Sequence, residues 1–114
     1  MQGKRLDRVN QLLKEEISLV LQRELKDPRL GFITVTEVET ANDLGVAKVF
    51  VSVLGDEAQS AASFAALKSA RGFIRHWLRS HLDLRITPEL DFRPDRSMAH
   101  AARIQELLKR LNDR

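Results

Sequence analysis

The amino-acid sequence predicts an α+β domain in which helices cover one apolar face of a three-stranded sheet. Two observations lead to this prediction. Stretches with helical hydrophobic periodicity alternate with short runs rich in β-branched residues, in the order helix, strand, strand, helix, helix, strand, helix. The chain has 114 residues, 43% of them hydrophobic, which is enough for one core. We therefore expect a single domain over residues 1–114.

The first expected element is a helix over residues 5–25. Its apolar side chains recur at steps of three and four residues, so they form one stripe that must pack on the rest of the domain. Asp27-Pro28 ends the helix, because proline cannot donate to the helix ladder and restricts the residue before it. Arg29 follows in this turn, and for the turn we favour a structural role over an RNA contact.

Two strands are expected over residues 32–39 and 46–53, which are both rich in valine and other β-branched residues. The linker 41–45 has the composition of a turn, so the pair is predicted to form an antiparallel hairpin. In the first strand Val38 is out of phase with the preceding apolar residues. This break in alternation predicts a β-bulge.

A helical run follows from Asp56, which can cap it, with Gln59 placed as the capping-box partner. Periodicity continues to about Leu82, but Gly72 lies inside the run and disfavours helix by about 1 kcal/mol relative to alanine. The sequence therefore predicts two helices joined by a kink at Ala70-Arg71-Gly72. Three aromatic side chains of this run fall on core phases: Phe64, Phe73 and Trp77.

The last two expected elements are a strand over residues 84–93 and a helix over residues 97–111. Apolar and polar side chains alternate in the strand, and its orientation in the sheet is left open. Pro88 removes one ladder donor, so this strand is predicted to lie at an edge or to be bulged there.

Composition excludes several classes of protein. There is no cysteine, so disulfides, thiolate metal sites and a cysteine nucleophile are excluded. No apolar run reaches the roughly 18 residues of a membrane span, and no signal peptide is recognisable, so we expect a cytoplasmic protein without membrane contact. The net charge is +3, and residues 67–114 alone carry +5. A basic half favours a polyanionic partner.

Motifs for catalysis and cofactors are missing from the sequence. No phosphate-binding Walker loop and no glycine-rich dinucleotide turn occur. His76 and His81 are five residues apart, a spacing that does not stack them on one helical face. Glu15 and Glu16 are adjacent and diverge around a helix, so they do not form a catalytic carboxylate pair. We expect no cofactor, no metal site and no catalytic residue.

One feature stands out, a row of four cations at helical spacing: Lys68, Arg71, Arg75 and Arg79. No acidic residue lies between the first of them and Asp83, so the row is not a ladder of ion pairs within the helix. One interpretation is a solvated face that serves solubility. The other is a surface for phosphates, since arginine offers forked donors to phosphate oxygens.

The predicted kink at residues 70–72 lies inside this row. KH modules bind nucleic acids with a GxxG loop between two helices, where glycine lets the nucleic-acid backbone approach and free N–H groups of a helix N-terminus point at phosphate. The junction here has the position of that loop without its sequence.

Four segments together are far more specific than the row of cations: residues 21–31 (LQRELKDPRLG), 47–52 (AKVFVS), 70–75 (ARGFIR) and 85–92 (RITPELDF), the last followed by Asp95 and Ser97. In these segments the chain resembles the ribosome-binding factor A family of bacterial small-subunit maturation factors. The resemblance runs over essentially the whole chain. It departs at Ala101, where the family pattern usually has glycine, so we expect a more regular final helix here.

The resemblance implies a type II KH-like fold in the order α-β-β-α-kink-α-β plus a C-terminal helix, with an Ala-x-Gly kink in place of GxxG. It also implies a non-enzymatic factor that binds the free 30S ribosomal subunit and its 16S rRNA. That factor assists late maturation, including processing of the 5′ end of 16S rRNA, and is important for growth in the cold. A ribosome-linked GTPase is an implied partner.

We therefore expect RNA contacts from three groups of residues: the row of cations (Lys68, Arg71, Arg75, Arg79), the kink (Ala70, Gly72) and the N-terminal cations (Lys4, Arg5, Arg8). The protein is expected to act as a monomer. Two other functions stay open. One is a protein-interaction module with an apolar strand face or helix as its contact surface and a solvated basic face. The other is an enzyme whose site forms only in space.

Overall fold

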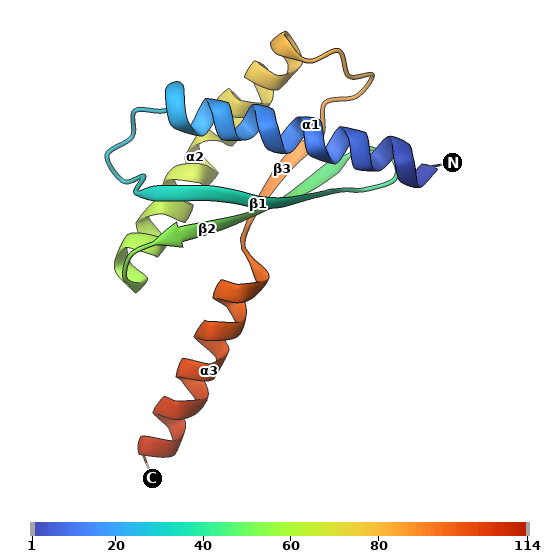
Figure 1. Cartoon of the computed structure of the whole chain (residues 1–114). Helices are drawn as coiled ribbons and strands as arrows, with labels where there is room; N and C mark the ends of the chain where they lie inside the picture. The colour runs from blue at the N-terminus through green and yellow to red at the C-terminus, as the bar shows by residue number, and fades with distance from the viewer. Residues whose placement is uncertain (1, 114) are drawn as a thin grey trace.

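The computed structural model describes residues 2–113 and confirms an α+β fold (Figure 1). Its described part contains three helices and three strands: α1 (Gln2–Arg23), β1 (Phe32–Thr40), β2 (Val46–Leu54), α2 (Glu57–His81), β3 (Glu89–Pro94) and α3 (Arg96–Asn112). The first helix and both strands of the hairpin lie where the sequence predicts them.

The three strands form one mixed sheet in the order β1-β2-β3. β1 and β2 pair antiparallel, as predicted, and the register shifts between Val35 and Glu37, which confirms the bulge. β3 pairs with β2 in parallel, which settles the orientation that the sequence left open. The parallel pairing requires a crossover between β2 and β3, and α2 supplies it.

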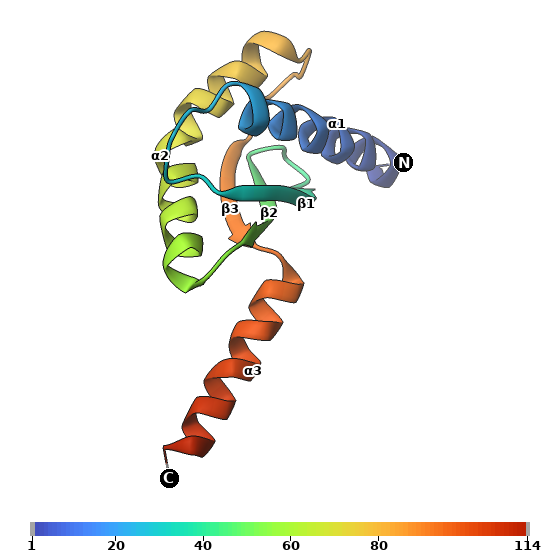
Figure 2. The same ribbon diagram turned by 60° about the vertical axis from the view of Figure 1, so that its left-hand side comes forward.

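The core lies between one face of this sheet and the two helices α1 and α2 (Figure 2). Alternate residues of β2 point into it, from Ala47 to Val53. The helices contribute six apolar side chains without solvent exposure: Leu13, Ile17, Val20, Leu67, Ile74 and Leu78. Because these residues recur at helical spacing, they fix which side of each helix faces solvent.

α2 corrects one prediction, because it is one continuous helix where two joined by a kink were expected. The ribbon of α2 curves over the sheet in Figure 2 while the helix continues through Gly72. The glycine lacks a positive φ, and a Cβ atom added to it would meet nothing within 4 Å, so neither strain nor packing requires glycine there. The capping box at Asp56 and Gln59 is confirmed.

The third strand is shorter than predicted. Residues 82–88 form a loop, and pairing begins only at Glu89, whose N–H donates to the Gly45 carbonyl at 2.9 Å. Pro88 directly precedes the strand and is fully buried, and β3 is an edge strand. Ile86, which lies within the stretch predicted as strand, is 45% exposed in this loop. The proline ring has no N–H for the ladder, so pairing starts after it.

One aromatic residue, Phe73, differs from its predicted place, whereas Phe64 and Trp77 pack against the core as predicted. Phe73 is 48% exposed instead of lying in the core, because α2 presents Ile74 and Leu78 to the sheet and Phe73 lies to the side. Trp77 is half-buried against the core, and its indole Nε1 donates to a Glu16 carboxylate oxygen at 3.1 Å. The same ring stacks on His81, with centroids 3.8 Å apart.

α3 leaves the body of the protein and points away from the sheet (Figures 1 and 2). It begins at Asp95, whose carboxylate accepts from the Met98 N–H at 2.7 Å, and it runs without a break past Ala101. The Cα radius of gyration is 15.7 Å, against about 13 Å for a compact domain of this length. α3 therefore covers no face of the sheet, unlike α1 and α2.

Candidate nucleic-acid interface

The four cations predicted to form a row all lie on α2, and because the helix is continuous they share one side of it. We call Lys68, Arg71, Arg75 and Arg79 the α2 cationic row. Leu67, Ile74 and Leu78 are buried, so they turn the opposite side of α2 toward solvent. Among residues 2–113, none of the ion pairs involves a member of the row. Its charge is not neutralised within the described part of the chain.

Arg75 differs from the other three members. Its Nε and Nη2 both donate to the Thr87 carbonyl oxygen, at 3.2 and 3.0 Å, and its side chain is half-buried. Thr87 is itself 8% exposed and directly precedes the buried Pro88. Arg75 therefore holds the loop that leads into β3, so its forked donors are committed within the fold.

Lys68 and Arg71 border a shallow groove between α2 and β3, whose other lining residues are Phe64, Ala65, Asp91 and Phe92. Both cations are exposed, and the Arg71 Nε donates to the Lys68 carbonyl at 3.1 Å. Asp91 is paired with Arg93 at 3.0 Å. Arg71 keeps its two terminal nitrogens for a ligand, since within residues 2–113 only its Nε is in a hydrogen bond.

Gly72 lies on the same side of α2 as the cationic row, and space beside it is open. Ala70, its predicted companion, is half-buried and packs against the core. Because α2 is continuous, the N–H groups of residues 70–72 belong to the helix ladder. They cannot bind phosphate as the end of a helix would, so this part of the KH analogy is wrong. What remains is open space beside Gly72, on the side of α2 that carries the cations.

The N-terminal cations Lys4, Arg5 and Arg8 are exposed on the first turns of α1. α2 crosses α1 at Glu16, where Trp77 donates its hydrogen bond, several turns further along. The N-terminal end of α1 points away from α2 in both views (Figures 1 and 2). The structure therefore keeps these three cations as a second basic group, apart from the α2 cationic row.

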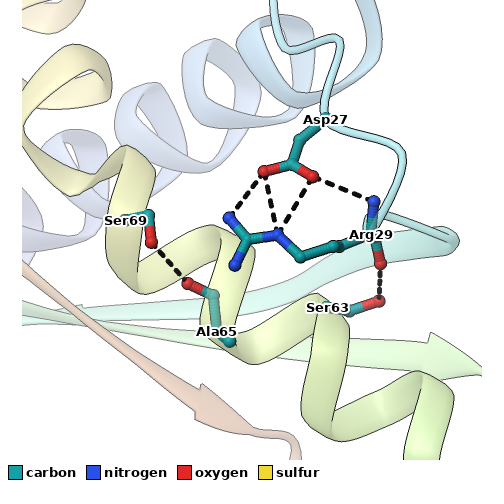
Figure 3. A network of polar contacts seen from close by, with 5 residues as sticks. All are labelled: Asp27, Arg29, Ser63, Ala65 and Ser69. Atoms are coloured by element: carbon teal, nitrogen blue, oxygen red, sulfur yellow. Dashed lines mark hydrogen bonds and ion pairs between the residues drawn. The ribbon is translucent and has the colours of Figure 1, made fainter.

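A network of hydrogen bonds links the loop after α1 to α2 (Figure 3). The sequence predicted the turn in this loop but not its contact with α2. The Asp27 carboxylate accepts from the Arg29 backbone N–H at 2.9 Å and from its guanidinium at 2.7 Å. These hydrogen bonds hold the pKa of Asp27 below its usual value and raise the pKa of Arg29. The buried Ser63 hydroxyl donates to the Arg29 carbonyl and accepts from the Gly31 N–H. Both contacts support the structural role expected for this turn.

Other kinds of site are not apparent in the described residues. Within residues 2–113, no cluster of three histidine or carboxylate side chains is placed to hold a metal ion. No helix in that range is both long and apolar enough to span a bilayer. The candidate site therefore consists of the groove between α2 and β3 and the exposed cations of the α2 cationic row.

Comparison with known proteins gives the family. The sequence model of ribosome-binding factor A matches residues 5–108. The chain belongs to the ribosome-binding factor A family. The ribosome-binding factor A of Halothermothrix orenii is 49% identical over 99% of this chain and 93% of its own length. That of Desulfitobacterium hafniense is 51% identical over 92% of this chain and 84% of its own.

Solved structures of this family share the fold. The crystal structure of ribosome-binding factor A from Thermus thermophilus aligns with a TM-score of 0.70 and 29% identity, covering 78% of this chain and 94% of that one. A homology model of Thermus thermophilus ribosome-binding factor A, fitted into the cryo-EM map of a 30S–RbfA complex, has the same fold. It aligns with a TM-score of 0.65 and 30% identity, over 76% of this chain and 91% of that one.

Proposed function

We propose that this chain is an assembly factor that binds the free 30S ribosomal subunit through its 16S rRNA. The observation that carries the proposal is the structural likeness to ribosome-binding factor A coordinates fitted into a 30S complex. The structural alignment covers 76% of this chain, and the sequence model of the family matches residues 5–108. The exposed cations of α2, which form no ion pair within residues 2–113, supply the chemistry that such binding needs.

In the proposed complex Lys68, Arg71 and Arg79 contact rRNA phosphates. Arginine offers forked donors to phosphate oxygens, and each neutralised phosphate releases counterions. Gly72 leaves room for the nucleic-acid backbone between these side chains. Arg75 acts as a positioning residue that holds the loop before β3. Phe64 and Phe92, the aromatic side chains that line the groove beside Lys68 and Arg71, are half-buried and pack against the core, so we propose recognition of backbone and shape rather than of bases.

Lys4, Arg5 and Arg8 form a second proposed contact with the same subunit, since they are exposed cations on another side of the protein. Two separated contacts would let one small domain bridge rRNA segments that must come together during maturation. We further propose that the protein is a single domain, acts as a cytoplasmic monomer without catalysis, and works beside a ribosome-linked GTPase. Its proposed role includes maturation of the 5′ end of 16S rRNA, with the largest need in the cold.

Cosedimentation with purified 30S subunits tests binding. We expect the chain to pellet with 30S subunits at low salt and to be released as salt rises, because phosphate contacts dominate. Binding that ignores salt would contradict the phosphate mechanism, and absence of binding at low salt would contradict the function. Complementation of a strain lacking its own factor, scored by precursor 16S rRNA at low temperature, tests the maturation role.

A further inference from the structure

The outer half of α3 exposes an apolar seam that nothing in residues 2–113 covers. Its members are Ile104, Leu107, Leu108 and Leu111, which are 43, 53, 55 and 63% exposed. They are spaced three, one and three residues apart, so they lie on one side of the helix over two turns. This is the spacing of a short coiled-coil seam. Contiguous exposed leucines on a projecting helix mark an interaction surface more often than a solvated face.

The charges beside the seam are of one sign. Arg103 and Arg110 are seven residues apart and lie along the same flank, while the other flank carries neutral Ala101 and Gln105. Glu106, the one acidic residue of α3, lies on the far side of the helix from the seam. Arg110 is paired only with Glu106 among the described residues, at 3.3 Å, and both side chains are more than 65% exposed. Such a pair contributes little and exchanges readily.

The leucine seam and its flanking arginines together indicate which kind of partner covers this side of α3. A second copy packed antiparallel would place Arg103 of one chain near Arg110 of the other, and like charges beside a seam disfavour that pairing. RNA would neutralise the arginines but would leave the leucines in water. An apolar helix with acidic flanks satisfies both features at once, because its carboxylates meet the arginines while its seam covers the leucines.

We propose that the outer half of α3 is a docking site for an amphipathic protein helix with an acidic flank. The site is separate from the α2 cationic row, and its partner is a protein rather than rRNA. Ile104, Leu107, Leu108 and Leu111 supply the apolar contact, and Arg103 and Arg110 set the sign of the partner's charge. Because few tertiary contacts support a helix of this length, the last turns of α3 gain order when the partner binds.

The test uses two designed helical peptides with the same isoleucine and leucine seam, one with glutamate and one with lysine at the flanking positions. Each is titrated with the full-length chain and followed by fluorescence anisotropy. We expect saturable one-to-one binding of the glutamate peptide, with the lysine peptide at least about tenfold weaker. The double variant Leu107→Ser, Leu111→Ser should lose binding, and circular dichroism with a thermal melt should show that the body of the protein stays folded.

A charge-reversal variant, Arg103→Glu with Arg110→Glu, sharpens the result. It should prefer the lysine peptide, while its affinity for 30S subunits through the α2 cationic row stays unchanged. Equal affinity of the wild-type chain for both peptides would overturn the proposal, as would absence of binding. Concentration-dependent dimerisation that Leu107→Ser abolishes would make a second copy the occupant, and displacement of the glutamate peptide by an rRNA fragment would make RNA the occupant.

Discussion

α2 and α3 are both amphipathic helices that begin at a capping aspartate, yet they use their apolar sides differently. In α2, Leu67, Ile74 and Leu78 are fully buried against the sheet, and the cations are left on the outside. In α3, Leu107 and Leu111 are more than half exposed. Periodicity therefore predicts an apolar side, but it does not predict whether the partner of that side belongs to the same chain.

The largest expected difference between the two helices is in stability. Ile74→Ala should lower the free energy of unfolding by about 2–5 kcal/mol, because it leaves a cavity in a fully packed core. Leu107→Ala, the matched exchange on α3, should change it by no more than about 0.5 kcal/mol. Urea denaturation followed by tryptophan fluorescence measures both. Equal destabilisation by the two exchanges would mean that α3 packs on the body in solution.

A second contrast lies within the α2 cationic row. Arg75→Gln should cost about 1–3 kcal/mol, since the Thr87 carbonyl loses a charged forked donor in a mostly buried place. Arg79→Gln, on the same exposed side, should leave the unfolding midpoint nearly unchanged. Thermal melts of the two single variants measure this difference in stability. If Arg75→Gln has the same melting temperature as the wild type, the contact with the loop contributes nothing to stability. Arg75 would then count among the phosphate ligands.

Gly72→Ala should separate stability from binding. Alanine is favoured over glycine inside a helix, and its Cβ would meet no atom within 4 Å, so the variant should gain up to about 1 kcal/mol. The added methyl group lies among the cations, and we expect weaker binding to 30S subunits. A melt and a binding titration on the same preparation check this. Unchanged affinity in the stabilised variant would show that the open space beside Gly72 has no role in binding.

The smallest expected effect concerns the loop before β1. Hydrogen bonds from Arg29 lower the pKa of Asp27 in the folded protein, so the carboxylate contributes stability at pH values above its unfolded pKa. That contribution is lost as pH falls through the folded pKa. Asp27→Asn should therefore melt slightly below the wild type near neutral pH and converge with it in acid. A constant difference across the pH series would assign the effect to something other than ionisation.

Local signals in the sequence were enough for most of the fold. The valine-rich hairpin, its bulge, the capping box at Asp56 and the family resemblance all rest on residues close together in the chain, and all are confirmed. The kink at Gly72 was wrong because one glycine costs only about 1 kcal/mol, which burial of Ile74 and Leu78 outweighs. The beginning of β3 was placed too early because alternation continues through a loop that Pro88 keeps out of the ladder.

The sequence predicted which residues belong to the candidate site, but not how they are arranged in space. Helical spacing placed Lys68, Arg71 and Arg79 together on one exposed side. It could not show that Arg75 reaches Thr87, twelve residues away, because that contact exists only once β3 packs beside α2. Nor could it separate the N-terminal cations from the row, since their distance depends on where α1 crosses α2.

Salt dependence of binding to 30S subunits tests the central claim most directly, namely that Lys68, Arg71 and Arg79 of the α2 cationic row hold rRNA phosphates. Arg71→Gln with Arg79→Gln should flatten the slope of log affinity against log salt by about 1–2 and leave the melting midpoint unchanged. The matched pair on α3, Arg103→Gln with Arg110→Gln, should leave that slope unchanged. An unaltered slope in the α2 variant, or an equal loss in the α3 variant, would contradict the account.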